Sequence, residues 1–252
     1  MIFRRYTCLA GIIISLLLLS CTSENKPLID NNGKGLFLVS GAKTPIDDVV
    51  TASINNSNIR LEGYVVILGV PAAAKQETNI KKRFYKHEIM AVHILNFKNR
   101  QKLKNTDVLT IKHAEIIVLP DMKKNDFSVF VANPVLKKAI QEAANNGTLI
   151  TGIGRSRALI GKYYFQNKKI EPGLQLNENL VLDNLSLLNN NKSFIQNTTE
   201  KQGVVFVGLK AKSMLLFNNT KVVALNNAAI TLLYPDKKSK ITTNGTVVSL
   251  KQ

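Results

Sequence analysis

A glycine stands where a strand-to-helix turn would present a nucleophile. Residues 148–153 form an apolar, strand-like run, Gly154 follows it, and a helix is predicted directly behind it. Strand, sharp turn and helix together raise a nucleophilic side chain above the end of a parallel sheet. Here the turn reads GIGRS over 152–156, so neither Ser nor Cys stands at its apex. The stretch predicts the frame of an acyl-transfer site without its nucleophile.

Three polar side chains follow the apex. Ser156 lies two residues beyond it, where its side chain points elsewhere, so we expect it to bond backbone groups in the first turn rather than to replace the nucleophile. Arg155 and Arg157 stand at the same helix start, where exposed N–H groups favour anions. They are candidate ligands for a carboxylate or phosphate, and the alternative is a pair of solvated arginines.

The chain offers few groups for general-base or metal chemistry. Its histidines are His87, His93 and His113; His93 stands in an apolar run and is expected in the core, and the others stand at polar helix ends. No group of His, Cys, Asp and Glu has the spacing of a metal site. No Gly-x-x-x-x-Gly-Lys loop for phosphates is present. We therefore expect neither a metal nor a cofactor.

Apolar strands alternate with amphipathic helices through the first two-thirds of the chain. Continuous apolar strands of this kind indicate a parallel sheet that is covered on both faces. After Gly203 the pattern changes to short strands separated by Asn-rich turns, which favours an antiparallel part. The predicted strands are 35–41, 64–70, 90–96, 114–120, 148–154 and, after Gly203, 203–209, 213–219, 221–227, 228–235 and 245–250. The sequence predicts an α/β fold of three layers with an antiparallel C-terminal part.

Two of the predicted helices carry boundary signals. Thr44 is a candidate N-cap with Pro45 at the first helical position. The helix that begins at Asn133 and Pro134 ends before Gly147, a suitable left-handed cap. Its apolar side is expected to hold Val135, Leu136, Ala139, Ile140 and Ala143.

The N-terminus has the pattern of a targeting segment. Arg4 and Arg5 precede an apolar run that closes at Ser20 and Cys21, too short and too close to the terminus to favour a spanning helix. This resembles a bacterial lipobox, so we expect a signal peptide over 1–20, a lipidated Cys21 with a tether to 34, and one domain over 35–252. The alternative is an ordinary signal peptide with an incidental cysteine. Lipidation would place the protein in the bacterial cell envelope, on the outer membrane or the periplasmic face.

The chain is strongly basic. It carries 34 Lys and Arg against 17 Asp and Glu, a formal net charge of +17. Such a balance can suit anionic lipid, polysaccharide or nucleic acid. The lysines are scattered singly and in pairs without interleaved aromatic residues, so we interpret them as a solvated surface and expect no nucleic-acid partner.

The order of the segments resembles cyanophycinase and its relatives, the peptidase E-like serine peptidases of the class I glutamine amidotransferase-like fold. KGLFLVSGAK (34–43) resembles their opening strand and its glycine-rich turn, and AEIIVLP (114–120) the strand before a Gly-Gly-Asp-Gln motif. The segment 133–160 resembles the helix and strand that lead to a Gly-Thr-Ser-Ala-Gly elbow. NLVLDNLS (179–186) is similar to the strand before the family's histidine, and 203–235 to its closing block.

By this resemblance the family's catalytic positions fall on residues that lack its chemistry. In active relatives a serine attacks a carbonyl, a histidine takes its proton and an acid orients the histidine. Gly154 falls at the serine, and Asp183 matches the acid before the histidine. The histidine position falls on Leu185 or its neighbours Asn184 and Ser186, none of which is a base.

Two further motifs depart from the family. Its Asp-Glu pair falls on Lys210 and Ala211, and its Gly-Gly-Asp-Gln loop reads DMKK over 121–124. The resemblance therefore implies a degenerate site, with Gly154, Leu185 and Ala211 at catalytic positions.

We expect a pseudoenzyme that acts as a binding or interaction module. An acidic or peptide ligand would lie above Gly154, with Arg155 and Arg157 as anchors. The alternative is an active cyanophycinase-like or dipeptidase-like serine hydrolase whose catalytic residues are displaced. The sequence leaves the oligomeric state open.

Overall fold

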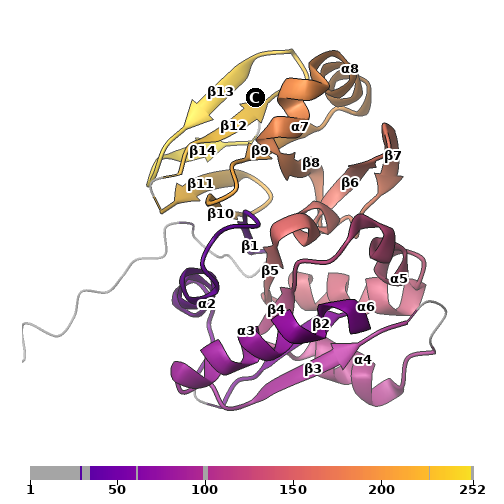
Figure 1. Cartoon of the computed structure of the whole chain (residues 1–252), viewed down its shortest axis with the longest axis vertical. Helices are drawn as coiled ribbons and strands as arrows, with labels where there is room; N and C mark the ends of the chain where they lie inside the picture. Colours follow the sequence, from indigo (N-terminus) through magenta and orange to yellow (C-terminus); the bar gives the residue numbers. More distant parts are fainter. Residues whose placement is uncertain (1–28, 30–34, 61, 99–101, 227, 251–252) are drawn as a thin grey trace, which may run out of the picture.

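The computed structural model describes residues 29, 35–60, 62–98, 102–226 and 228–250 (Figure 1). The predicted signal peptide and Cys21 lie outside the described residues. So does the predicted tether to 34 except for Ile29, which is buried in a core cluster rather than solvated. Among the described residues, no helix combines the length and the apolar character that crossing a bilayer requires.

An eight-stranded sheet dominates the part of the chain that the structure describes. Five neighbouring strands run parallel, and three antiparallel strands extend the sheet beyond β1. The parallel strands, in spatial order, are β3 (Val92–Asn96), β2 (Val65–Gly69), β4 (Ile116–Leu119), β5 (Leu149–Ile153) and β1 (Phe37–Ser40). The antiparallel strands are β10 (Met214–Phe217), β11 (Lys221–Leu225) and β14 (Val247–Ser249).

Helices cover both faces of the parallel strands, which explains why all of these strands except the edge strand β3 are buried along their whole length. In β1, Phe37 and Val39 join one core cluster and Leu38 joins the other. One face packs against α2 (Ile46–Asn55) and α3 (Ala74–Lys86). The other packs against α4 (Asn105–Lys112), α5 (Ser128–Val131) and α6 (Pro134–Asn145). The predicted three-layer α/β fold is confirmed.

A second sheet of six strands packs against the antiparallel end of the first. Side chains of both sheets form one core cluster between them. Its outer face packs against α7 (Leu185–Asn190) and α8 (Lys192–Gln202). Figure 1 shows this sheet above the parallel strands, with β12 and β13 in yellow. Its strands, in spatial order, are β13 (Ser239–Thr242), β12 (Ile230–Leu233), β9 (Val205–Leu209), β8 (Asn177–Asn184), β6 (Gly161–Gln166) and β7 (Lys169–Pro172).

The antiparallel C-terminal part is confirmed for β10, β11, β12 and β14, whereas β9 is antiparallel to only one of its two neighbours. β9 pairs parallel with β8, because α7 and α8 return the chain to the end of the sheet at which β8 began. β12 then pairs antiparallel with β9. The C-terminal strands thus divide between two sheets.

Several local predictions can be compared with the structure. Helix α6 begins at Pro134 as predicted, and Asn133 caps it: its Oδ1 accepts a hydrogen bond from the Leu136 N–H at 3.1 Å. Thr44 does not cap α2; its hydroxyl donates instead to the Ser213 carbonyl. Val135 is 53% exposed, although the rest of its predicted face is buried. His93 is exposed rather than in the core, because β3 is an edge strand.

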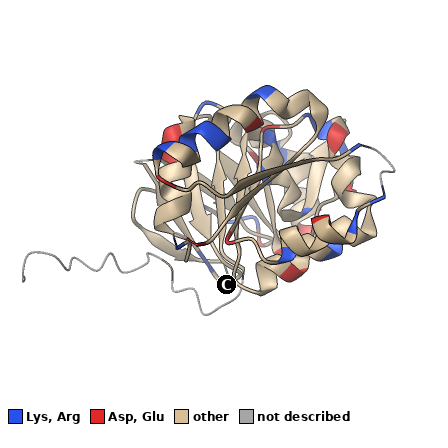
Figure 2. Ribbon diagram, turned by 90° about the horizontal axis from the view of Figure 1, so that it is seen from below, with Lys and Arg blue, Asp and Glu red and all other residues tan. Residues whose placement is uncertain are grey.

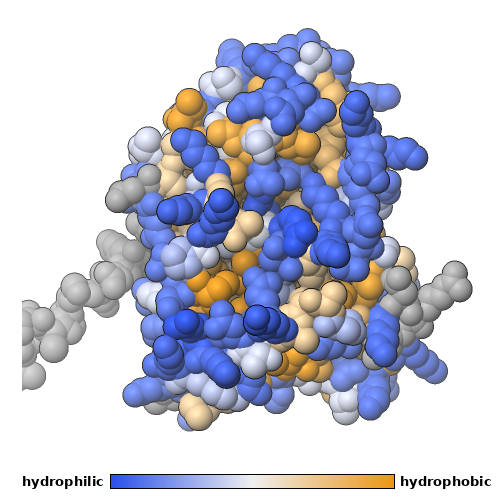
Figure 3. All heavy atoms as spheres, viewed as in Figure 1, coloured by the Kyte–Doolittle hydropathy of each residue, from blue (hydrophilic) through white to orange (hydrophobic). Residues whose placement is uncertain are grey.

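The surface matches the expected scatter of charge. Figure 2 shows Lys and Arg over the outer faces of the helices, interspersed with Asp and Glu. Hydrophilic side chains cover most of the face in Figure 3, and small hydrophobic patches lie between them.

Candidate functional site

The carboxyl ends of neighbouring parallel strands bring the predicted site residues together. Gly154 follows β5, Asp121 follows β4 by two residues, and Gly41 follows β1. In open α/β sheets, ligands bind at this edge. The predicted helix after Gly154 is a six-residue 3-10 segment, η3 (Gly154–Leu159). The candidate site therefore lies where β1, β4 and β5 end.

Gly154 has the backbone geometry of an apex residue. Its φ of +58° lies in the left-handed region, which side chains rarely adopt. A Cβ at this position would lie 2.6 Å from Cγ and Oδ1 of Asp121. Both the backbone and the space above it therefore require glycine here.

The carboxylate of Asp121 occupies the position in front of the apex. Its Oδ1 accepts hydrogen bonds from the backbone N–H of Arg155 at 2.7 Å and from Arg155 Nε at 2.9 Å. Its Oδ2 accepts from the Arg155 NH2 group at 2.9 Å, and this hydrogen-bonded pairing raises the pKa of Arg155. The N–H after the apex is the group that a working nucleophile elbow offers to the oxyanion. In this chain the N–H of Arg155 already donates to Asp121.

Ser156 holds the loop after β4 to η3. Its side chain is fully buried; its hydroxyl donates to the Pro120 carbonyl and accepts from the Met122 N–H. The expectation that Ser156 bonds backbone groups is confirmed. Together with the Asp121–Arg155 pair, it fixes the loop after β4 against the loop after β5.

Arg157 lies in the interior between the two sheets, with 1% of its surface exposed. Its guanidinium donates to the carbonyls of Gly154 at 2.7 Å and Ser40 at 3.3 Å, and to Asn184 Oδ1 at 2.6 Å. Burial lowers the pKa of Arg157, and the charges of Asp183 and Asp121 oppose that effect. The alternative of two solvated arginines was wrong for Arg157. A ligand in solvent cannot reach its guanidinium, whereas Arg155 is partly exposed and uses only Nε and one NH2 group on Asp121.

The predicted histidine position lies at the start of α7 and holds no base. Asp183 is buried at the end of β8, where its Oδ2 accepts from Lys124 Nζ at 2.5 Å and its Oδ1 from the Asn184 N–H at 2.8 Å. Leu185 is half-buried and packs with the hydrophobic cluster beneath α7. His87 follows α3 and His113 follows α4, so no histidine reaches Gly154.

The predicted Lys210 and Ala211 positions lie beside the end of β1. The backbone N–H of Lys43 donates to the Ala211 carbonyl at 2.8 Å, and Ala211 itself is exposed. This contact gathers the exposed side chains of Lys43, Lys210 and Lys212 on two adjacent loops. None of the three forms an ion pair with a described acid. We call them the lysine rim.

A shallow basic pocket adjoins the Asp121–Arg155 pair on its other side. It encloses about 720 Å³ and is lined mainly by α3, including Lys75, Gln76 and Lys82, together with Asp121. Gln76 Oε1 accepts from the Asp121 N–H at 2.8 Å. Asp121 is thus held from the α3 side and from η3. The described residues contain no group of His, Cys, Asp and Glu able to hold a metal ion.

Glu77 is a buried carboxyl group close to this pocket that sequence reasoning did not single out. It is 1% exposed, its Oε2 accepts from Asn96 Nδ2 at 2.9 Å, and its Oε1 has no described partner. Burial raises the pKa of Glu77, and the hydrogen bond from Asn96 opposes the rise. Its position on the buried face of α3, with Ile80 and Phe84, was the signal available in the sequence.

Two solved protein structures resemble the fold of this chain. A crystal structure of a peptidase from an acI-B1 Actinobacterium superposes with a TM-score of 0.62 at 14% identity, covering 87% of this chain and 98% of that one. A putative peptidase E protein from Listeria monocytogenes EGD-e superposes with a TM-score of 0.53 at 12% identity, covering 75% and 97%. The chain has a peptidase E-like fold. No protein-family model and no curated protein matches the sequence.

The Gly154→Ala substitution tests the steric conflict at the apex. Gly203, with φ +62° and nothing within 4 Å of an added Cβ, is the matched control for backbone strain alone. We expect Gly203→Ala to cost about 1 kcal/mol of unfolding free energy and Gly154→Ala about 2 kcal/mol more, because Asp121 must move. Adding Asp121→Ala should remove most of that difference. Equal costs for the two glycines, measured by urea unfolding, would contradict the predicted conflict.

The raised pKa of Glu77 predicts a pH dependence of stability. A carboxyl whose pKa is raised by folding stabilises the fold below its unfolded pKa, and this contribution is lost as pH rises through the folded pKa. Glu77→Gln stays neutral, so its stability relative to the native chain should grow as the pH rises from 4 to 8. Exposed Glu62 supplies the control, Glu62→Gln. A pH-independent difference for Glu77→Gln in urea unfolding would disprove the assignment.

Proposed function

We propose that this chain is a membrane-anchored, non-catalytic protein with a peptidase E-like fold that binds an acidic ligand at the carboxyl end of its first sheet. The observation that carries the proposal is the contact of the Asp121 carboxylate with the Arg155 N–H at 2.7 Å. This contact fills the position in which an acyl-transfer site stabilises negative charge.

Two further features support the absence of peptidase chemistry. Gly154 supplies no nucleophile, and its φ of +58° and the nearby Asp121 carboxylate disfavour any other residue there. Arg157 donates to Asn184, next to the predicted base position at Leu185. A guanidinium cannot accept a proton from a nucleophile, because it stays protonated at neutral pH.

Charge favours an acidic ligand around the blocked apex. The lysine rim (Lys43, Lys210, Lys212) lies at the end of β1, and Lys75 and Lys82 line the pocket that adjoins Asp121. Clustered cations without internal acid partners raise the local concentration of anions. A carboxylate-rich peptide could meet both groups without entering the interior.

The anchor proposed at Cys21 would orient this surface away from the membrane. The described chain enters β1 through Gly35, whose N–H donates to the Ala144 carbonyl, and the site lies beyond Ser40 at the opposite end of the strand. A lipid on Cys21 would then hold the protein in the bacterial cell envelope, on the outer membrane or the periplasmic face, with the lysine rim facing outward.

The second candidate function is a working serine hydrolase with displaced catalytic residues. It is supported by the two structural neighbours, which are described as a peptidase and a putative peptidase E protein. A serine-directed probe separates this candidate from the first.

Treatment of the full chain with a fluorophosphonate probe, followed by intact-mass analysis, tests the loss of activity. We expect no adduct on the native chain and none on Gly154→Ser, because a serine there has no base to take its proton. An active serine peptidase treated in parallel shows that the probe works, and circular dichroism shows that both chains are folded. One stoichiometric adduct on a single serine of the native chain would establish the second candidate instead.

Charge reversal of the lysine rim tests the acidic ligand. The variant that carries Lys43→Glu, Lys210→Glu and Lys212→Glu should bind a hexaglutamate peptide at least about tenfold more weakly, since three attractive charges become repulsive. Binding to the native chain should weaken as salt is added. The control reverses Lys168, Lys192 and Lys201, which changes the net charge equally. Equal effects of the two variants would mean that only overall charge matters and would reject the site, while leaving the probe experiment unaffected.

A further inference from the structure

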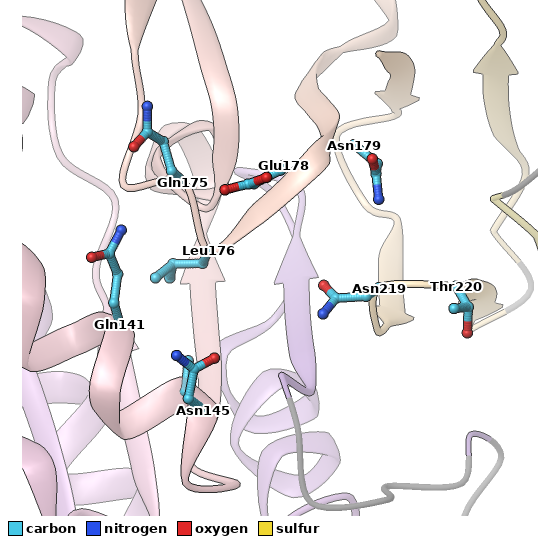
Figure 4. Close-up of a pocket in the computed structure, with 9 residues that line it drawn as sticks. Gln141, Asn145, Gln175, Leu176, Glu178, Asn179, Asn219 and Thr220 are labelled. Atoms are coloured by element: carbon cyan, nitrogen blue, oxygen red, sulfur yellow. The ribbon is translucent and has the colours of Figure 1, made fainter. Parts of the chain in front are cut away.

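A second cavity lies at the other end of the first sheet (Figure 4). It encloses about 440 Å³ and is formed where α6 ends, where the chain enters β8, and at the turn between β10 and β11. Its polar lining includes Gln141, Asn145, Gln175, Glu178, Asn179 and Asn219. The volume falls in the range of small-ligand sites. Nothing in the proposed function uses this cavity.

The composition of the lining is unlike that of the chain. The chain carries 34 Lys and Arg residues, yet neither type lines this cavity, and Glu178 is its one charged residue. Lys137 bonds Gln175 but does not itself line the cavity, so an anion would find no lysine or arginine among the lining residues, in contrast to the pocket at α3. The lining therefore favours a neutral ligand with many hydrogen-bonding groups.

Hydrogen bonds fix the orientation of the side-chain amides of Gln141 and Gln175. Gln141 Nε2 donates to the Leu174 carbonyl at 2.9 Å; since a carbonyl can only accept, Oε1 of Gln141 remains as an acceptor. Gln175 Oε1 accepts from Lys137 Nζ at 2.8 Å; since an ammonium can only donate, the NH2 group of Gln175 remains as a donor. Gln141 thus keeps an acceptor and Gln175 keeps a donor that no described residue uses.

The backbone at Gln175 supports this arrangement. Its φ of +58° is in the left-handed region, which is costly for a residue with a side chain. The hydrogen bond from Lys137 accompanies that conformation and holds the side chain against α6.

The remaining amides are available to a ligand. The side chains of Asn145, Asn179 and Asn219 have no hydrogen-bond partner among the described residues. In Figure 4, Asn179 points toward Asn219 across the cavity, and Asn145 projects from the end of α6 below them. Leu176 adds an apolar surface beside these amides.

We propose that this cavity binds a neutral carbohydrate. A sugar hydroxyl both donates and accepts, so neighbouring hydroxyls match amides that present oxygen and NH2 groups in alternation. Its C–H face packs on Leu176 and Ala144, and its lack of charge suits a lining without cations. The cavity accommodates a mono- or disaccharide rather than a long chain.

Titration of the ¹⁵N-labelled full chain with N,N′-diacetylchitobiose and, separately, maltose tests the proposal. We expect at least one of these neutral sugars to produce saturable shifts in the NH2 signals of Gln175, Asn179 and Asn219. Asn179→Ala and Asn219→Ala should each weaken binding about fivefold to tenfold, the effect of one lost hydrogen bond. Asn197→Ala, an exposed asparagine on α8, is the control and should leave binding unchanged.

Three results would overturn the proposal: no saturable shift with either sugar at about 20 mM, well above a millimolar Kd; shifts confined to residues outside the cavity; or equal weakening by Asn197→Ala. Glucuronic acid provides the charge control. Tighter binding of this anion than of the neutral sugars would also contradict the neutral chemistry assigned to the lining. None of these outcomes bears on the probe experiment.

Discussion

The buried guanidinium of Arg157 is the constraint on which the arrangement of the two sheets depends. A charge with 1% exposure is tolerated only when the protein replaces its water with hydrogen-bond acceptors. Those acceptors come from the end of β1, from the turn after β5 and from Asn184 at the end of β8. The first two strands belong to the first sheet and β8 to the second. One side chain therefore holds together the carboxyl ends of both.

Around Arg157, carboxylates are matched with cations instead of being left for catalysis. Asp121 pairs with Arg155, Asp183 pairs with Lys124, and the negative charges of both oppose the lowering of the Arg157 pKa. A catalytic crevice keeps its dipoles free for charge that develops in the transition state. Here the backbone N–H of Arg155, which follows the apex, already donates to the Asp121 carboxylate. These pairings are the structural basis of the non-catalytic role that we propose for this chain.

The parallel core was predictable because its sequence signals are local. Strands β1, β2, β4 and β5 are apolar at consecutive positions, and α6 has both a capping asparagine and a terminal glycine, with φ +94° at Gly147. The burial of His93 and Val135 was predicted wrongly because burial depends on what packs against an element. The periodicity of a sequence does not show which strand lies at the edge of a sheet or which turn of a helix is exposed.

The position of the site was predictable from the sequence, but the contacts between its side chains were not. Gly154 was expected at the apex, and the loop over 121–124 was expected to lack its motif. That Asp121 pairs with Arg155 could not be derived from either segment alone, since the two are 34 residues apart. The available signal was topological: both residues follow apolar strands, and β4 and β5 are neighbours. The second sheet was missed because β6, β7 and β13 are short, partly polar strands.

Hydrogen exchange at the backbone N–H of Arg155 tests the central claim most directly, because that amide is the donor a working site would leave free. We predict strong protection in the native chain and loss of protection in Asp121→Ala, with the amides of β5 equally protected in both. Rapid exchange at Arg155 in the native chain, with β5 protected, would show that the donor is free. The apex would then be open to an oxyanion, and the account of a blocked site would be wrong.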